Sequence, residues 1–492
     1  MNQLQDKLKG MYIGAILGDA LGRPIEFLDR CTIRRKFGSA KSYIRRFRDI
    51  DKNKTSDETS LLVNSIGYFN NPEESYQAHL GRLAERGEDY LRERGFSAKM
   101  RALIHHYREH PREQNPHTDN TGSGFVPMCL PLIAQTNSII AQTNSIENLT
   151  ADLYTIMDLT HREADKLWAS HYFRALFATL KEESIFTAMG KPGLEELSRQ
   201  KELRLVLSGN IEATPKKIDG SANNILPTAL SLYVASGCDF YKMLDLSFSQ
   251  FDTADYDTLF FCVGALIGAS RGYKGLPRDL LDKIEGEIDV NGIDVYVRKS
   301  SLTKENIITS ERTKKLQMLL SNEDILEEEP TELIEVIPEL SLERSYNSRQ
   351  PRHCYDLLEH TLRTVQAIPK EDYVLRLAAL LHDVAKPFVR GEKEGRVHYH
   401  NHAKCGARMS YNILSRLGFP EEEKEVVCKL IEEHIINYNK NWSDAAVRRF
   451  VKRNCDILEK LFRLVKADNS AQLKDPRRGY DELTERIASL SS

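Results

Sequence analysis

Residues 10–22 read GMYIGAILGDALG, a stretch in which every fourth residue is a glycine. The four glycines are Gly10, Gly14, Gly18 and Gly22. Residues four apart share one face of an α-helix, so the spacing predicts a helix with a smooth stripe against which a second helix packs very closely. Asp19 and Arg23 interrupt the apolar run, which argues against a membrane helix.

The rest of the chain also shows helical periodicity. Leu, Ala, Glu, Lys and Arg recur at three- and four-residue spacing. One buried stripe consists of Leu375, Ala378, Ala379, Leu381 and Val384. Alternating β-branched runs are short and rare, and the clearest, residues 288–297, is interpreted as a hairpin. The predicted fold class is all-α, with two helical domains that each form a bundle.

Composition and charge narrow the functional classes. The chain has 492 residues, enough for two or three domains. Lys and Arg total 69 and Asp and Glu total 72, which argues against a dedicated nucleic-acid coat or a polybasic membrane binder. The eight cysteines include no C-x-x-C pair, so neither a disulfide framework nor a cysteine zinc site is expected. Without a membrane span or a convincing signal peptide, the sequence predicts a cytoplasmic protein and no membrane partner.

A change in composition separates the two predicted domains. Residues 321–345 are crowded with Glu and Asp and contain Pro330 and Pro338, as in an exposed acidic linker. The sequence therefore predicts a first domain over 1–298, an acidic linker region over 299–345 and a second domain over 346–480.

Three acidic motifs stand out in the first domain. They are residues 18–27 (GDALGRPIEF), 56–59 (SDET) and 255–258 (DYDT). Carboxylates beside hydroxyl groups suit hard cations such as Mg²⁺, and distant clusters can supply opposite sides of a two-metal site. The alternative is that they are solvated helix caps, with Asp57 as a simple N-cap.

These motifs resemble those of the ADP-ribosylglycohydrolase family over residues 6–275. That family opens with a G-x-x-x-G-x-x-x-G-D-A-L-G segment and P-x-E-F, matched here by 10–22 and 24–27. Its S/T-D-D-T motif is matched by 56–59, its central T-H pair by 160–161, and its late G-D-x-D-T motif by 255–258.

The resemblance implies an all-α domain with two Mg²⁺ ions in a cleft and an ADP-ribosylated substrate. The implied metal ligands are Ser56, Asp57, Glu58, Asp255, Asp257 and Thr258. Glu26 matches the mobile acidic group that acts as base, and Asp57 and Asp257 complete the catalytic set. Gly122, Ser123 and Gly124 are expected to cradle a diphosphate, with His161 as a further substrate-binding residue. Asp19 is expected to be structural.

The sequence departs from the family pattern in three places: Glu58 stands where Asp is usual, Tyr256 replaces a small residue, and the loop 122–131 lacks an Arg. A binding-only domain therefore stays open as an alternative. The basic residues within 34–48 form either a solvated surface or a rim that attracts a polyphosphate or RNA.

The second domain contains an informative histidine series. It comprises His360, the adjacent pair His382 and Asp383, His402, His434 and finally Asp468. Burying an adjacent His-Asp pair at the end of an apolar helix is costly unless both bind a metal or each other. Lys386 lies one helical turn beyond His382, where it could meet a phosphate.

This stretch resembles the HD phosphohydrolase superfamily, and most of all the HD domain of CCA-adding tRNA nucleotidyltransferases, over about residues 350–475. The H…HD…D pattern is matched by His360, His382, Asp383 and Asp468. The resemblance implies hydrolysis of a phosphomonoester or phosphodiester with a divalent metal, Mg²⁺, Mn²⁺, Ni²⁺ or another transition metal. Asp383 and Lys386 would be catalytic. His402 and His434 would bind phosphate or a second metal, or else lie on a polar surface.

The leading interpretation is a bifunctional metal-dependent hydrolase. The first domain would cleave an ADP-ribosyl linkage and the second a phosphate ester, with RNA or a nucleotide as the candidate partner. Two alternatives remain: an HD phosphatase or phosphodiesterase with a non-catalytic ADP-ribose-binding module, and a non-enzymatic ADP-ribose sensor.

Overall fold

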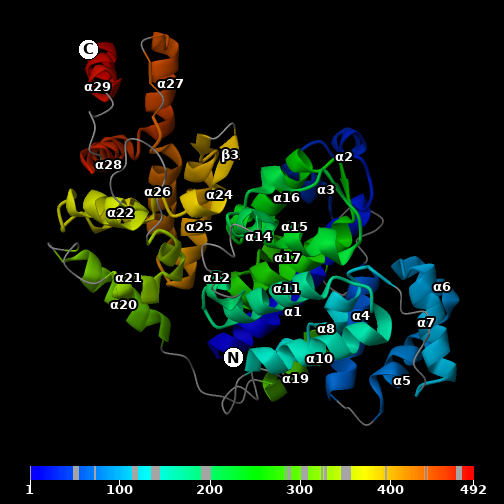
Figure 1. Ribbon diagram of the computed structural model, residues 1–492. Coiled ribbons are helices and arrows are strands. Elements are labelled where there is room, and N and C mark those ends of the chain that lie inside the picture. The colour runs from blue at the N-terminus through cyan, green and yellow to red at the C-terminus, as the bar shows by residue number, and fades with distance from the viewer. Residues whose placement is uncertain are drawn as a thin grey trace. The chain divides into compact units, whose positions relative to one another are not determined.

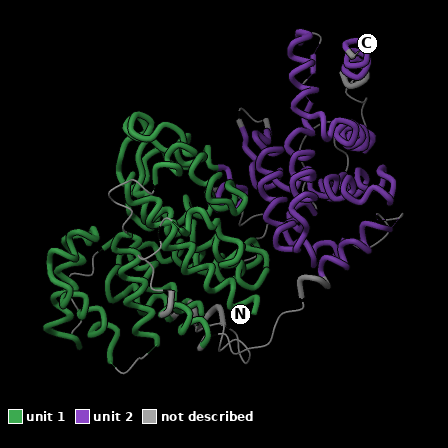
Figure 2. The backbone as a smooth tube through the Cα atoms, turned by 180° about the vertical axis from the view of Figure 1, so that it is seen from behind, with its two compact units in different colours: residues 1–191, 211–306 green, residues 192–210, 307–492 purple. Residues whose placement is uncertain are grey.

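The computed structural model divides the chain into two compact units (Figure 2). Unit 1 comprises residues 1–191 and 211–306, and unit 2 comprises residues 192–210 and 307–492. The structure describes residues 2–47, 55–70, 74–112, 120–134, 145–189, 201–282, 284, 290–300, 308–322, 325, 330–344, 356–393, 396–436, 438–439, 441–471 and 479–491. In these residues the only sheets are two short strand pairs, so the all-α prediction is confirmed.

Unit 1 is built around two central helices, α1 and α17, with the other helices packed about them (Figure 1). Its first half comprises α1 (Gln3–Gly22), η1 (Arg23–Ile25), α2 (Arg30–Phe37), α3 (Ala40–Arg46), α4 (Asp57–Asn70), α5 (Tyr76–Gly81), η3 (Arg82–Arg86), α6 (Glu88–Arg94), α7 (Ala98–Glu109), α8 (Phe125–Cys129), α10 (Ser145–Thr160), α11 (Lys166–Leu180) and α12 (Ile185–Ala188). Its second half comprises η4 (Ile211–Ala213), β1 (Lys217–Ile218), α15 (Ala222–Ser236), α16 (Phe240–Gln250), β2 (Thr253–Ala254), α17 (Tyr256–Arg271), η5 (Tyr273–Gly275), α18 (Arg278–Leu281) and α19 (Val290–Ser300). Strands β1 and β2 pair in parallel.

The glycine stripe of α1 sets the close packing of these two helices. A Cβ atom at Gly14 would clash with the Gly264 carbonyl oxygen, and one at Gly18 would clash with the Phe260 carbonyl oxygen. At the end of the helix, a Cβ at Gly22 would meet the carbonyl group of Tyr256. The close helix contact predicted from the sequence is confirmed, and it brings the C-terminal end of α1 against the N-terminal end of α17.

The hairpin expected at 288–297 is wrong for the described residues 290–297, which lie in helix α19. The buried side chains of this segment are Ile293, Tyr296 and Val297, and Val295 is exposed. Spacings of three and four residues between buried positions are helical, so the β-branched content of the segment gave the wrong periodicity.

Unit 2 is a second helical bundle with one antiparallel hairpin, β3–β4, between its helices. Its elements are α14 (Lys201–Leu207), α20 (Ile308–Leu320), α21 (Thr331–Val336), η6 (Pro338–Leu342), α22 (Leu357–Gln366), α23 (Tyr373–Leu381), α24 (Lys386–Val389), β3 (Gly391–Lys393), β4 (Arg396–His398), α25 (His402–Arg416), α26 (Glu421–Glu433), α27 (Asp444–Asn454), α28 (Leu458–Ser470) and α29 (Gly479–Ser491). Helices α22, α23, α26 and α28 pack on one another. The predicted stripe on α23 is fully buried.

The structure differs from the predicted domain limits and from the predicted acidic linker. Residues 308–320 and 331–342 form helical segments of unit 2, and Leu316, Leu333 and Leu340 are buried. Among the acidic residues, leucines at three- and four-residue spacing form an apolar stripe that is buried in the bundle. The high content of Glu and Asp hid this stripe from the sequence prediction. Residues 192–210 also belong to unit 2, where Arg204 donates to the Pro387 carbonyl at 3.2 Å. The predicted linker residues 299–300 end helix α19, whereas 301–307, 323–324, 326–329 and 345 lie outside the described residues.

None of the helices in the described part of the chain is both long and apolar enough to cross a membrane.

Candidate functional site

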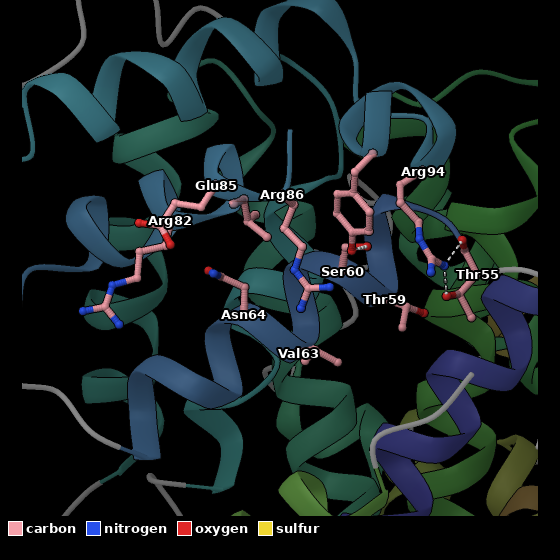
Figure 3. A pocket seen from close by; sticks show the side chains of 11 residues that line it. Thr55, Thr59, Ser60, Val63, Asn64, Arg82, Glu85, Arg86 and Arg94 are labelled. Atoms are coloured by element: carbon pink, nitrogen blue, oxygen red, sulfur yellow. Dashed lines mark hydrogen bonds between the residues drawn. The ribbon is translucent and has the colours of Figure 1, made fainter. Parts of the chain in front are cut away.

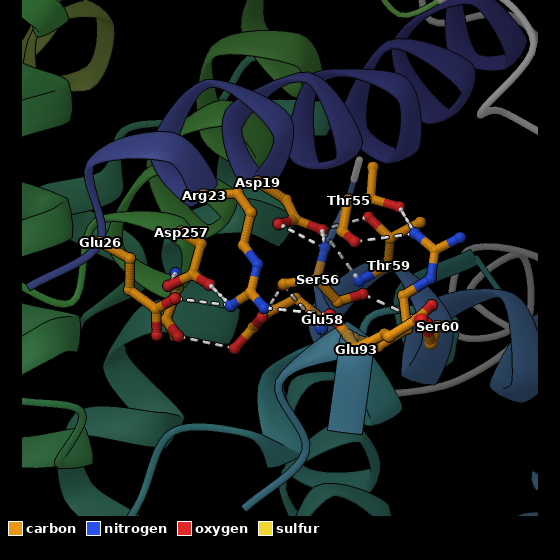
Figure 4. A network of polar contacts seen from close by, with 12 residues as sticks. Asp19, Arg23, Glu26, Thr55, Ser56, Glu58, Thr59, Ser60, Glu93 and Asp257 are labelled. Carbon is orange, nitrogen blue, oxygen red and sulfur yellow. Dashed lines mark hydrogen bonds and ion pairs between the residues drawn. The ribbon is translucent and has the colours of Figure 1, made fainter. Parts of the chain in front are cut away.

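An acidic cluster forms in unit 1 where the C-terminal end of α1 meets the N-terminal ends of α4 and α17 (Figure 4). The motifs 56–59 and 255–258 stand at the starts of these two helices, so their backbone N–H groups favour carboxylates. The Thr258 hydroxyl donates to Glu58 Oε1 at 2.6 Å, although the two residues lie 200 positions apart. The convergence of the two motifs, expected from the sequence, is therefore present.

Asp19 holds the start of α4 in place. Its carboxylate accepts from the Ser56 N–H at 2.9 and 3.0 Å, from the Thr59 N–H at 3.2 Å and from the Thr59 hydroxyl. Burial raises the pKa of Asp19 to about 7, and the charge of Glu58 adds to the rise. These hydrogen bonds position the first turn of α4.

Glu58 connects α4 to α17. Its carboxylate accepts from the Ser56 hydroxyl on one oxygen and from the Thr258 hydroxyl on the other. The extra methylene of Glu, compared with Asp, gives this side chain the reach to bond both hydroxyls.

Two sets of carboxylates are close enough to hold a cation. One oxygen from each of Asp19, Glu58 and Asp257 lies within 4.8 Å of the others, and the same is true of Glu26, Asp255 and Asp257. An all-oxygen donor set of this kind is what Mg²⁺ takes in proteins. Asp57 belongs to neither set, although it is the first residue of α4 and lies beside them.

The carboxylates of this cluster are buried and repel one another. Burial raises the pKa of Asp57 and of Asp257 well above the usual range, and in both cases the charge of Glu58 is the next cause. Burial also raises the pKa of Glu26 and of Asp255. A bound cation would relieve this repulsion, so the donor set fits a divalent metal ion electrostatically.

A cation already lies within the cluster. Arg23 Nη1 is 2.5 Å from Glu26 Oε2 and 3.4 Å from Asp257 Oδ2, and Nη2 donates to the Glu93 carbonyl at 3.2 Å (Figure 4). Burial alone would lower the pKa of Arg23, but the carboxylates of Glu26 and Asp257 raise it. The sequence interpretation used Arg23 only as a break in an apolar run and missed this role. Its position between two motif segments was the available signal.

The expected substrate-binding loop lies next to the cluster. Ser123 donates through both its N–H and its hydroxyl to the Gly220 carbonyl, each at 2.9 Å. A Cβ at Gly220 would meet the Asp255 carboxylate at 2.5 Å, and a Cβ at Gly124 would lie 3.2 Å from His161 Nε2. Burial lowers the pKa of His161 to about 3, so this imidazole is neutral. Residues 122–124 and His161 are therefore brought together with Asp255.

A cavity of about 560 Å³ lies beside the first turn of α4, at Thr59 and Ser60 (Figure 3). It is lined by Thr55, Thr59, Ser60, Val63, Asn64, Arg82, Leu83, Glu85, Arg86, Tyr90 and Arg94. The guanidinium groups of Arg86 and Arg94 lie 5.2 and 5.6 Å from the centre of the Tyr90 ring. Arg94 Nη1 also donates to the carbonyl oxygen and the hydroxyl of Thr55, at 2.7 and 2.8 Å. A guanidinium group beside an aromatic ring, as Arg86 provides, suits a nucleotide or another phosphate-bearing group.

Unit 2 contains a second cluster, built from histidines. In all four histidines of the cluster, Nδ1 lies against a backbone carbonyl oxygen: Ala471 for His360 (3.5 Å), Ala379 for His382 (2.7 Å), Tyr399 for His402 (2.8 Å) and Ile431 for His434 (2.6 Å). This contact fixes each ring and directs Nε2 into the cluster, which is how metal-ligating histidines are held.

The four Nε2 atoms converge on two carboxylates. His360 Nε2 is 3.1 Å from Asp468 Oδ1, and His382 Nε2 is 3.2 Å from Asp383 Oδ2. On the other oxygen of Asp383, His402 and His434 Nε2 lie at 3.8 and 3.9 Å. Two groups of three side chains are close enough to hold a metal ion: His360–His382–Asp468 and Asp383–His402–His434. Asp383 belongs to the second group and also contacts His382 of the first.

The electrostatics and the unpaired atoms of this cluster fit a divalent metal. Burial alone would lower the pKa of His382, but the Asp383 carboxylate outweighs it and raises the pKa to about 9. Burial lowers the pKa of His434 to about 3, which keeps this imidazole neutral. Asp383 Oδ1 is buried and has no hydrogen-bond partner among the described residues, and His382 Nε2 has only the Asp383 carboxylate near it there. Buried polar atoms are rarely left unpaired, so these atoms are suited to bind an ion.

Two further side chains adjoin the histidine cluster. Lys386 pairs with Asp383 Oδ2, so its ammonium group lies at the cluster, as expected for a phosphate-binding residue. Glu343 is fully buried and accepts from the Thr361 hydroxyl at 2.8 Å. Burial raises the pKa of Glu343 to about 8. Sequence reasoning missed Glu343 because it lies in the segment assigned to the exposed linker.

The fold and the two clusters define a helical protein with candidate metal-binding groups, carboxylates in one unit and histidines in the other. Comparison with known families agrees. The ADP-ribosylglycohydrolase model matches residues 1–311 and the HD-domain model matches residues 352–469. The first match covers more than half of the chain, so the chain belongs to the ADP-ribosylglycohydrolase family, and its C-terminal part carries an HD domain. Both are families of hydrolases.

Individual proteins match each part. The A-adding tRNA nucleotidyltransferase of Deinococcus radiodurans is 35% identical over 125 residues, 24% of this chain and 28% of that protein. The CC-adding tRNA nucleotidyltransferase of Thermus thermophilus is 35% identical over 131 residues, 25% of this chain and 30% of that protein. The chain thus spans less than a third of either relative. A solved ADP-ribosylglycohydrolase-related protein complex covers 61% of this chain and 100% of its own, with 20% identity and a TM-score of 0.47.

Proposed function

We propose that the protein is a bifunctional metal-dependent hydrolase. Unit 1 cleaves an ADP-ribosyl glycosidic bond, and unit 2 hydrolyses a phosphomonoester or phosphodiester of a nucleotide or an RNA end. The observation that supports the proposal is that each unit contains two groups of candidate metal-binding side chains drawn from distant parts of the sequence matched by its family. The cytoplasmic location remains a prediction.

In unit 1 we assign different roles to the carboxylates. Asp257 belongs to both oxygen sets, Glu58 to one and Asp255 to the other, so these three would line two cation positions, at least one of which would hold Mg²⁺. A bound Mg²⁺ would polarise the ribose hydroxyls of the substrate. Glu26 is partly exposed at the edge of the cluster, where a carboxylate can take a proton from the attacking water. Asp57, at the positive end of α4, would stabilise charge that develops on the ribose.

In unit 2 the imidazoles and the carboxylates of Asp383 and Asp468 would hold a divalent metal, Mg²⁺, Mn²⁺, Ni²⁺ or another. A bound metal would lower the pKa of a water molecule and neutralise phosphoryl oxygens. Lys386 would hold a phosphate oxygen of the substrate. His402 and His434 share Asp383 in the second group and would hold either a second metal or the phosphate.

The shared chemistry of the two units suggests the substrate class. The two relatives of the HD domain are named for adding nucleotides to tRNA, and the cavity beside the acidic cluster of unit 1 offers guanidinium groups to a phosphate-bearing group. We therefore propose ADP-ribosylated RNA, or a nucleotide released from it, as the substrate rather than an ADP-ribosylated protein.

One observation favours a second candidate function. Arg23 pairs with Glu26 and Asp257, and these are the carboxylates proposed as base and metal ligand. A unit 1 limited in this way would bind ADP-ribose without cleaving it, and the HD domain alone would be the enzyme.

The test is a substrate screen with the full chain in Mg²⁺ and in Mn²⁺. We expect release of ADP-ribose from ADP-ribosylated RNA ends and, separately, hydrolysis of 2′,3′-cyclic nucleotides. Binding of ADP-ribose with no release from any ADP-ribosylated RNA or protein would establish the second candidate instead. Absence of both hydrolytic activities would refute both candidates.

A further inference from the structure

Arg23 occupies a position in the acidic cluster that a metal ion could otherwise take. Its guanidinium group contacts Glu26 and Asp257, which are two of the three residues in one of the oxygen sets of unit 1. It makes no hydrogen bond or ion pair with Glu58 or Asp19, which belong to the other set. Arg23 thus contacts two residues of the first set but only the shared Asp257 of the second.

The surroundings of Arg23 are shaped to accept its side chain. The Arg23 side chain is 18% exposed and that of Asp257 is 3% exposed. The guanidinium group therefore lies among the carboxylates on the solvent-facing side of the cluster. Nη2 is held by the Glu93 carbonyl. Gly95, at the end of α6, has φ 96°, and a Cβ there would lie only 2.8 Å from Arg23 Nη1. Glycine at this position therefore leaves room for the guanidinium group.

We propose that Arg23 is a built-in cation that replaces one of the two divalent ions expected in unit 1. Arg23 supplies the cation for the set Glu26–Asp255–Asp257, and the set Asp19–Glu58–Asp257 binds one divalent ion. This inference rests on the proposed function of unit 1 and specifies its metal requirement. A guanidinium group donates hydrogen bonds but has no vacant orbital for a water oxygen, so Arg23 can hold a hydroxyl or phosphate oxygen of the substrate but cannot generate a metal-bound hydroxide.

Electrostatics give the proposal its measurable consequence. A divalent ion within a few ångströms of a guanidinium group is repelled by it, and the repulsion is strong where water is scarce. Removing the guanidinium group leaves Glu26, Asp255 and Asp257 without a cation, and like-charged carboxylates at this spacing bind divalent ions. The loss of Arg23 should therefore add a metal site rather than destroy one.

The experiment counts Mn²⁺ ions bound by the full-length protein, using electron paramagnetic resonance to measure free Mn²⁺. The variants are Arg23→Ala, Arg23→Gln, the double variant Arg23→Ala/Asp255→Asn, which alters only the Glu26–Asp255–Asp257 set, and, as matched control, Arg92→Ala. Arg92 is 65% exposed and pairs with Glu88 away from the cluster. Sites in the HD domain contribute equally to every variant, so differences in stoichiometry report unit 1.

We expect Arg23→Ala and Arg23→Gln to bind one more Mn²⁺ than the wild type, and the double variant to lose this gain. Arg92→Ala should bind as the wild type does. The thermal midpoint of Arg23→Ala should be lower than that of the wild type without metal and should rise more on addition of Mn²⁺. If Ala at position 23 prevents folding, the Gln variant supplies the same comparison.

Equal Mn²⁺ stoichiometry in the wild type and both Arg23 variants would overturn the proposal. This result is distinguishable from failure of the proposed function, which is judged by ADP-ribose release. A gain of one ion without any hydrolysis would support the role of Arg23 and reject the glycohydrolase activity. Hydrolysis by the wild type with unchanged stoichiometry would do the reverse.

Discussion

The acidic cluster of unit 1 and the histidine cluster of unit 2 bring together motif residues in electrostatically opposite ways. In unit 1 the carboxylates repel one another, and the pKa of Asp257 lies well above its usual range because of burial and the charge of Glu58. In unit 2, imidazole and carboxylate groups alternate. Although burial alone would raise the pKa of Asp468, the hydrogen bond from His360 lowers it. The acidic cluster needs a bound cation to offset the repulsion between its carboxylates. In the histidine cluster, protonated imidazole already offsets the carboxylate charge, so a proton must leave before a metal binds.

Removal of the shared ligand should have the largest effect. Asp383 lies within 4 Å of His360, His382, His402 and His434, so Asp383→Ala should remove bound metal and lower the turnover of cyclic nucleotides. Substituting even the outer partners of metal ligands costs about 10–100-fold, so we expect a loss of more than about 100-fold. Metal content by mass spectrometry and hydrolysis rates measure the two effects. A variant that keeps full metal content would contradict the assignment.

The matched control for that variant is Asp456→Ala. Asp456 lies on the surface of unit 2 and pairs with Lys429 at 2.5 Å. Both metal content and turnover should stay near the wild-type values.

The corresponding variant in unit 1 is Asp257→Ala. Asp257 belongs to both oxygen sets, so its loss should abolish release of ADP-ribose and leave hydrolysis of cyclic nucleotides near the wild-type rate. The comparison uses Asp158→Ala, a substitution of an exposed residue on α10, as control. Equal loss of both activities in Asp257→Ala would show that the two clusters do not act as separate sites.

The opposite electrostatics of the clusters should appear as a pH dependence of metal affinity. His382, with its pKa raised to about 9, holds a proton at neutral pH, and Nε2 must lose that proton to bind a metal. Affinity of the HD domain should therefore rise about tenfold per pH unit from pH 7 toward pH 9 and level off above it. Calorimetry in buffers of different ionisation enthalpy measures the proton released. Metal binding without proton release at pH 7 would contradict this assignment.

Glu343 offers a smaller, stability-based test. Its pKa is raised in the folded protein to about 8, so the contribution of its neutral form is complete below the unfolded pKa of about 4.3 and is lost as the pH rises through about 8. Glu343→Gln stays neutral at every pH. The free energy of unfolding of Glu343→Gln minus that of the wild type should therefore increase by about 1 kcal/mol per pH unit between about pH 4.3 and pH 8. Denaturant unfolding at several pH values checks this, and a difference that does not change with pH would refute it.

The sequence predicted the features that rest on local spacing. The glycine stripe of α1 follows from a four-residue repeat, and the buried face of α23 follows from helical periodicity. The grouping of His360, His382, Asp383 and Asp468 followed from resemblance to a known pattern, and the structure places these residues together. Spacing or motif order carried the information in each case.

The features that the sequence did not predict depend on contacts between distant segments. Arg23 lies between two motif segments, but its contact with Asp257 depends on α17, and sequence spacing does not mark that contact. Glu343 was assigned to a linker because the surrounding acidic residues masked the apolar stripe that buries it. The segment 192–210 belongs to unit 2, although it lies within the stretch matched by the first family.

The central claim is that one chain carries two distinct metal-binding hydrolase sites. Crystals of the full-length protein grown with Mn²⁺, and measured at the manganese absorption edge, test this claim most directly. We predict one anomalous peak among the oxygens of Asp19, Glu58 and Asp257, with Arg23 still against Glu26, and at least one peak among the Nε2 atoms around Asp383. Peaks in only one of the two clusters, in crystals saturated with Mn²⁺, would contradict the account.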